Sequence, residues 1–87
     1  MPSELLKCRV CGLLQASPPW GDDDATPSFE ICDCCGVEFG YEDTTRASVA
    51  RYRESWLKAG ARWQSPRMRP ESWNVYRQLE DIPLEWR

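Results

Sequence analysis

Residues 8–12 read Cys-Arg-Val-Cys-Gly and residues 32–36 read Cys-Asp-Cys-Cys-Gly, so a Cys-x-x-Cys-Gly turn, here called a knuckle, occurs twice. The 20 residues between Cys11 and Cys32 are close to the spacing of structural zinc sites. One such turn directs two sulfurs at an ion about 2.3 Å away, and two turns complete a closed tetrahedron without water. The sequence therefore predicts one tetrathiolate metal site whose ligands are Cys8, Cys11, Cys32 and Cys35.

Disulfides and buried free thiols are the alternatives to a metal site. Disulfides belong to oxidising compartments, whereas clustered Cys-x-x-Cys pairs in a reducing compartment are more often metal ligands. The odd count of five cysteines also disfavours complete pairing. We therefore expect one bound Zn²⁺, while noting that a tetrahedral sulfur site also accepts iron and that the doubled knuckle is similar to those of rubredoxin.

Residues beside the four cysteines are expected to tune the site. Gly12 and Gly36 permit a positive φ, which turns backbone N–H groups toward the sulfurs. Four thiolates around a divalent cation leave a charge of about −2, and we expect Lys7 and Arg9 to flank the site and offset it. The predicted ion is thus surrounded by hydrogen-bond donors and cations.

Cys34 is one cysteine more than a tetrahedral site needs. It replaces Cys35 as a ligand, or it is a reactive thiol activated by the nearby metal, or it is a small knuckle residue with no chemistry, which we favour. The chain has no histidine, the commonest catalytic base and the usual ligand of catalytic zinc. We therefore do not expect an enzyme.

Hydrophobic periodicity predicts a small α+β domain spanning residues 1–87. Apolar and polar residues alternate over 29–31 and 37–41, as in a half-buried hairpin. Residues 1–43 are therefore predicted to form a rubredoxin-like or zinc-ribbon β-hairpin module around the metal. Residues 44–87 are expected to pack on it as a basic, Trp-rich helical segment.

Two helices are expected in this second half. An apolar stripe at helical spacing predicts an amphipathic helix over 44–59, with Asp43 or Thr44 as its N-cap and Gly60 just beyond its end. A second, shorter helix is expected over 71–80. The stripe consists of Val49, Tyr52, Trp56, Gly60 and Trp63.

The charge of the chain is distributed unevenly. The net charge is −3, but residues 1–43 carry −7 and residues 44–87 carry +4. Such polarity orients a partner or lets the basic segment lie against the acidic one. The sequence has neither a basic and apolar leader nor a run of about 18 to 20 apolar residues, so we expect a cytoplasmic protein that does not enter membranes.

Residues 28–43, together with the knuckle at 8–12, resemble the bacterial cysteine-rich CPCC family. The name of that family describes Cys-Pro-Cys-Cys, whereas this chain has Asp33 in the proline position. Residues 53–61 look like the helix that follows in such proteins, and residues 69–73 are a weaker echo. The resemblance implies a rubredoxin-like or zinc-ribbon module and a role as an immunity or regulatory partner in a bacterial toxin system.

The sequence leaves three functions open. The first is a protein-binding module that contacts its partner through the second half, because Trp, Tyr and Arg are enriched at interface hot spots. The second is nucleic-acid binding by the same cations and aromatics, which the acidic first half opposes. The third is one-electron transfer at an iron site. The residues expected to contact a partner are Arg51, Lys58, Arg62, Trp63 and Trp73.

Overall fold

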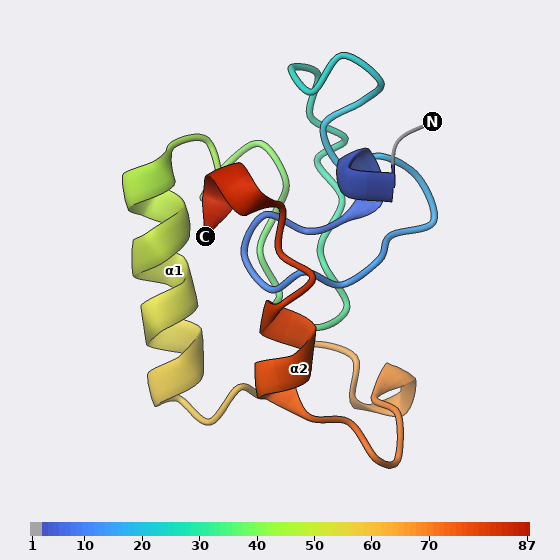
Figure 1. Ribbon diagram of the computed structural model, residues 1–87, viewed down its shortest axis with the longest axis vertical. Coiled ribbons are helices and arrows are strands. Elements are labelled where there is room, and N and C mark those ends of the chain that lie inside the picture. Colours follow the sequence, from blue (N-terminus) through green and yellow to red (C-terminus); the bar gives the residue numbers. More distant parts are fainter. Residues whose placement is uncertain (1–2) are drawn as a thin grey trace.

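The computed structural model describes residues 3–87, in which short helical elements are joined by long loops (Figure 1). In Figure 1, α1 forms the left side of the molecule and the C-terminal turn lies beside it. None of the helices in this part of the chain is long and apolar enough to cross a membrane. The elements are α1 (Arg46–Lys58), α2 (Val75–Leu79) and 3-10 turns at Ser3–Leu6, Pro66–Met68 and Leu84–Trp86.

The beginning of α1 is set by a reciprocal capping box. Thr45 Oγ1 accepts a hydrogen bond from the Ser48 N–H at 3.0 Å, and Ser48 Oγ accepts one from the Thr45 N–H at 3.1 Å. The N-cap is therefore Thr45, and the predicted caps Asp43 and Thr44 are wrong. The predicted stop is confirmed, because Gly60 follows the helix with a φ of 100°, a left-handed conformation that ends helices.

The predicted β-hairpin module does not form. Residues 3–87 contain no β-strand or sheet, and their only β-type pairings are two isolated antiparallel bridges, Lys7 with Leu14 and Ile31 with Glu38. The interpretation of the fold as an α+β zinc ribbon or rubredoxin-like hairpin is therefore wrong. The knuckles are instead held by loops and by the helical second half.

The chain around the second knuckle shows why the alternation of apolar and polar residues predicted a hairpin that does not form. Cys32 N–H donates to Val37 O at 3.0 Å and Phe39 N–H donates to Glu30 O at 2.9 Å, so the chain does turn back on itself. Phe29 N–H still donates to Phe39 O at 3.1 Å, but Phe29 adopts a φ of 62°, which leaves the extended region, and the Ser28 N–H donates to Pro19 O instead. Two arms this short, with no third strand paired to them among residues 3–87, do not make a sheet.

α2 is shorter than the helix predicted over 71–80. The side-chain oxygen of Asn74 accepts hydrogen bonds from the N–H groups of Tyr76 at 2.9 Å and Arg77 at 3.3 Å. An asparagine side chain that captures these N–H groups caps a helix rather than continuing one. The helix therefore begins only at Val75.

Both halves of the chain contribute to one buried core. The knuckles supply cysteines and a few apolar side chains, and the second half covers them with α1 and the loop that follows it. A core with so few large apolar side chains stabilises a domain of this size only marginally, so the state of its cysteines matters. Its buried members are Cys8, Val10, Cys11, Cys32, Cys34, Cys35, Val37, Phe39, Val49, Trp56, Ala61 and Trp63.

Arg53 fastens α1 to the first knuckle and to the C-terminal turn. Its Nε donates to Val10 O at 2.7 Å, and its Nη2 donates to Arg9 O at 2.8 Å and to Trp86 O at 2.7 Å. Burial lowers the pKa of the guanidinium, which nevertheless stays charged at neutral pH. One side chain thus joins three segments that are far apart in sequence.

Arg53→Lys is expected to lower the free energy of unfolding by about 2 kcal/mol, because lysine keeps the charge but cannot reach three carbonyl groups at once. In a domain of this size the corresponding fall in Tm is about 8–16 °C. Thermal unfolding with zinc present, followed by circular dichroism, measures it. Arg51→Lys, on the exposed side of the same helix, is the matched control and should leave Tm within about 4 °C. Equal Tm values for the two variants would contradict this role.

Candidate metal centre

Four cysteine sulfurs from the two knuckles converge at one buried point. Their Sγ atoms all lie within 4.8 Å of one another, with Cys8 and Cys35 separated by 3.7 Å and Cys11 and Cys32 by 3.6 Å. A regular tetrahedron with metal–sulfur distances of about 2.3 Å has edges of about 3.8 Å. The four buried cysteines are therefore positioned to hold a metal ion.

The two knuckles share one backbone geometry. In each, the N–H of the first cysteine donates to the carbonyl five residues later, and the glycine N–H donates to the carbonyl of that cysteine, at 2.9–3.0 Å. Gly12 and Gly36 have the expected positive φ, 84° and 81°. At Gly12 a Cβ would lie 2.7 Å from the carbonyl oxygen of Gln78, so only glycine lets the C-terminal segment approach.

Two glutamine side chains donate to sulfurs of the knuckles. Gln15 Nε2 lies 3.5 Å from Cys32 Sγ, and Gln78 Nε2 lies 3.3 Å from Cys34 Sγ. The donor from Gln15 reaches a sulfur of the four-cysteine cluster and would offset the negative charge of the thiolates, whereas the donor from Gln78 reaches Cys34, which is outside the cluster. Sequence reasoning missed both: Gln15 is only three residues beyond the first knuckle, whereas Gln78 is 67 residues from Cys11 and no local pattern indicates it.

Cys34 lies beside the four-sulfur cluster and is not a member of it. The cluster contains Cys35 instead. The Cys34 side chain is fully buried, its sulfur accepts the hydrogen bond from Gln78, and its carbonyl oxygen accepts one from the Gln64 N–H at 2.9 Å. The contacts of Cys34 thus connect the second knuckle to the second half of the chain.

Lys7 precedes the first knuckle and Arg9 lies within it, and the contacts of their charged groups are with residues other than the cysteines. Lys7 Nζ forms an ion pair with Glu4 at 3.3 Å. The Arg9 guanidinium lies between the rings of Trp20 and Trp86, 3.9 and 4.0 Å from their centroids. A cation between two aromatic faces is a favourable arrangement that also holds the C-terminal turn against the knuckle.

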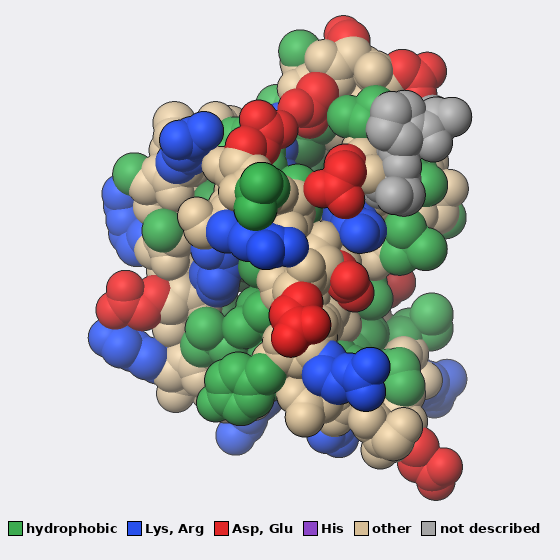
Figure 2. All heavy atoms as spheres, in the orientation of Figure 1, with side chains coloured by type: hydrophobic (Ala, Val, Ile, Leu, Met, Phe, Trp, Pro, Cys, Tyr) green, Lys and Arg blue, Asp and Glu red, His purple; other side chains and the backbone are tan. Residues whose placement is uncertain are grey.

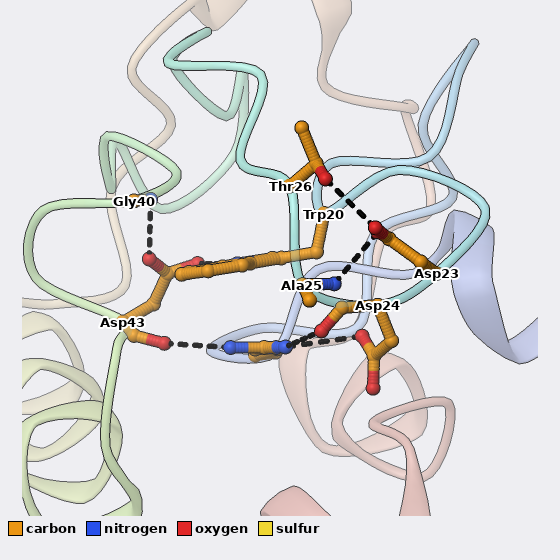
Figure 3. Close-up of polar contacts among 8 residues, drawn as sticks. Trp20, Asp23, Asp24, Ala25, Thr26, Gly40 and Asp43 are labelled. Carbon is orange, nitrogen blue, oxygen red and sulfur yellow. Dashed lines mark hydrogen bonds and ion pairs between the residues drawn. The ribbon is translucent and has the colours of Figure 1, made fainter.

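Arg9 also closes the acidic loop that connects the knuckles. Its Nη2 donates to Asp24 Oδ1 at 3.0 Å, and its Nη1 donates to Asp43 O at 3.1 Å. Figure 3 shows the Asp43 carboxylate held between Gly40 and Trp20, whose N–H groups each donate to it at 2.8 Å. Buried Asp43 and buried Arg9 are thus both satisfied within one network.

Three of the five residues expected to contact a partner line a single cleft. Arg62, Trp63 and Trp73 surround a volume of about 400 Å³, here called the 60–73 cleft. Lys58 and Arg51 lie outside it: Lys58 pairs with an acidic residue one turn earlier on α1 at 2.9 Å, and Arg51 lines a separate hollow. The other residues lining the 60–73 cleft are Gly60, Ala61, Pro66 and Arg69.

Adjacent cysteines provide a matched test of the ligand set. Cys35→Ser is expected to weaken zinc binding by more than 100-fold, because it removes one of four thiolates. Cys34→Ser is expected to keep one metal ion per chain and to lower stability only modestly. Metal content by mass spectrometry and a chelator competition titration measure both. Retention of tight binding in Cys35→Ser, or its loss in Cys34→Ser alone, would assign the ligands differently.

Metal affinity is expected to rise with pH between about 6 and 8. Burial raises the pKa of the Cys11 and Cys35 thiols, whereas hydrogen bonds from neighbouring thiols, Cys11 first, lower the pKa of Cys32. A cation must therefore displace at least two protons at neutral pH, so affinity should gain about 100-fold per pH unit. Competition titrations across this range measure the slope, and an affinity independent of pH would contradict thiol ligation.

Comparison with known proteins identifies two relatives in Bacillus subtilis (strain 168), while no family model and no solved structure matches the chain. The uncharacterized protein YozI is 27% identical over 84 residues, which cover 78% of this chain and 69% of YozI. The uncharacterized protein YoaQ is 31% identical over 88 residues, which cover 82% of this chain and 73% of YoaQ. Similarity of this extent over most of both sequences shows that the chain belongs to the same family as YoaQ.

Proposed function

We propose that this chain is a non-catalytic, zinc-stabilised module that binds another protein through the 60–73 cleft. The observation that carries the proposal is that both walls of this cleft are hydrogen-bonded to the knuckles. In this view the metal centre is the scaffold of a binding surface and performs no reaction itself.

The first wall, formed by the loop after α1, is attached to the second knuckle. The N–H groups of Gln64 and Ser65 donate to the carbonyl oxygens of Cys34 at 2.9 Å and Asp33 at 2.8 Å. Ser65 Oγ also donates to Asp33 Oδ1 at 2.9 Å. Residues 64 and 65, directly after Trp63, are therefore hydrogen-bonded to the two residues that lie between the cysteine ligands of the second knuckle.

The second wall contains Trp73, and Gln78 links it to both knuckles. Trp73 Nε1 donates to Gln78 Oε1 at 2.7 Å. The amide nitrogen of Gln78 in turn donates to Cys34 Sγ at 3.3 Å and to Cys11 O at 3.1 Å. A change in how the cysteines are held would therefore reach Trp73 through the side chain of Gln78.

The donor set favours a structural ion over a catalytic one. Four sulfur ligands fill a tetrahedral shell, whereas catalytic zinc keeps a position open for water or substrate. We propose that the ion is zinc rather than iron. The second half of the chain forms a cleft suited to binding, and no residue of this half serves one-electron transfer. Membership of the CPCC family, and a role as an immunity or regulatory partner in a toxin system, are parts of this proposal that rest on the resemblance of the knuckles.

Affinity capture with the intact, zinc-loaded chain tests the proposed function. After nuclease treatment of the lysate, we expect a protein to remain bound, and the purified protein should form a complex with a Kd below about 10 µM. Removal of zinc by a chelator should weaken this complex at least tenfold. Micromolar binding of a generic oligonucleotide that falls steeply with salt would favour a nucleic-acid role instead. A red protein with thiolate-to-iron absorption would favour electron transfer.

The variants Gln78→Met and Gln15→Met distinguish effects on partner binding from effects on zinc binding. Gln78→Met removes the link to Trp73, so we expect nearly full zinc content with at least fivefold weaker partner binding. Gln15→Met removes a donor to a ligand sulfur, so we expect about 10-fold weaker zinc binding and unchanged partner affinity at saturating zinc. Metal titration and partner binding are measured for both variants. Identical profiles would show that the two sites are not organised in this way.

A further inference from the structure

The 60–73 cleft carries chemistry that indicates its occupant. Resting on the proposed function, we infer that it binds an acidic segment of the partner protein in which carboxylates flank an apolar side chain. The inference depends on three features of the cleft: an apolar floor, unpaired cations at its rim, and a backbone already fixed in shape.

The floor of the cleft is apolar and aromatic. Trp63 is only 8% exposed and meets Trp73 edge to face, with centroids 5.4 Å apart and an interplanar angle of 82°. Buried Ala61 and exposed Pro66 add further apolar surface to the lining. A volume of about 400 Å³ lies in the range of ligand-sized pockets, so it accommodates an apolar side chain with its neighbouring backbone.

The rim carries cations without acidic partners. Arg62 and Arg69 line the cleft, Arg67 lies between them in the sequence, and residues 59–70 contain no acidic residue. All three arginines are exposed, and none takes part in the ion pairs formed within residues 3–87. In Figure 2, Lys and Arg side chains lie along the left edge and lower margin as well as in the centre, and acidic side chains are most numerous in the upper part but also occur in the centre, at the left edge and at the lower right. Carboxylates of an occupant would complement this rim.

The same residues are poorly arranged for nucleic acid. Single-stranded nucleic acid needs open aromatic faces on which bases stack. Arg69 lies over the Trp73 ring at 5.5 Å, Trp63 meets the same ring edge-on, and Trp56 lies 6.4 Å from it. Since Trp63 is itself buried, the cleft offers cations and an apolar floor rather than a stacking platform.

The loop that forms the first wall is held in its binding shape. Ala61 adopts a φ of 52°, which is uncommon for a residue with a side chain. Its N–H donates to Trp56 O at 2.9 Å, and the Trp56 indole N–H donates to Arg62 O at 2.9 Å. A rim fixed before binding reduces the entropy lost on association.

The tryptophan indoles provide a site-specific test. The probe is the peptide Gly-Glu-Glu-Leu-Glu-Glu-Gly, titrated into the ¹⁵N-labelled, zinc-loaded full chain. We expect the indole N–H signals of Trp63 and Trp73 to shift, while those of Trp20 and Trp86, which stack on Arg9, remain in place. The matched peptide with glutamine in place of glutamate should bind at least tenfold more weakly.

Charge variants separate the cleft from the general basic character of the second half. The double variant Arg62→Gln with Arg69→Gln is expected to weaken peptide binding at least tenfold. Arg51→Gln combined with Lys58→Gln removes the same charge outside the cleft and should change binding less than twofold. Equal weakening by the two pairs, or equal affinity for the glutamate and glutamine peptides, would overturn the inference.

Other occupants give different results in the same experiment. A ten-nucleotide oligo-dT that shifts the Trp63 and Trp73 signals with higher affinity than the peptide would replace it as the occupant. Shifts that depend on protein concentration without peptide would indicate a second copy of the chain. If a captured partner binds the Arg62→Gln, Arg69→Gln variant as tightly as the wild type, the cleft is not its binding site, although the chain still acts as a protein-binding module. If no protein partner is captured, the proposed function itself is wrong.

Discussion

The convergence of four buried thiols is the constraint on which the rest of the structure depends. Sulfurs 3.6–3.7 Å apart are too close to be left as free thiolates, and burial raises the pKa of Cys11 and Cys35 so that both hold protons unless a cation replaces them. The apolar core around them is small, with Phe39 and Trp56 among its few large side chains. A cation held by these cysteines would therefore contribute to the folding of a chain whose apolar burial alone is marginal.

The opposite charges of the two halves do not hold them together. Within residues 3–87 every ion pair joins residues of the same half, as Arg9 does with Asp24 and Lys58 with Glu54. Arg53 crosses between the halves, but it donates to carbonyl oxygens. Apart from Arg53, the basic residues of the second half are exposed, so most of its positive charge lies at the surface.

Local patterns predicted local structure well and long-range structure poorly. Cysteine spacing identified the four residues that the structure brings together, because each Cys-x-x-Cys motif is local and occurs twice. Helical periodicity identified α1, because its apolar residues repeat within one continuous segment. The β-hairpin prediction was wrong because alternation alone supplies no neighbouring strand and the positive φ at Phe29 carries no sequence signal. Gln78 escaped notice because its partners, Cys11 and Cys34, are 67 and 44 residues away.

The two knuckles of the internal repeat connect the first half of this short chain to different segments of the second half. Between the ligands of the first knuckle, the carbonyl groups of residues 9–10 accept hydrogen bonds from Arg53 of α1. Between the ligands of the second knuckle, the carbonyl groups of residues 33–34 accept hydrogen bonds from the backbone of residues 64–65. The carbonyl groups of the two middle residues in each turn are acceptors, so they need hydrogen-bond donors from other parts of the chain. One knuckle therefore anchors the helix and the other anchors the loop of the cleft, and an ion bound by the four cysteines would tie the two knuckles together.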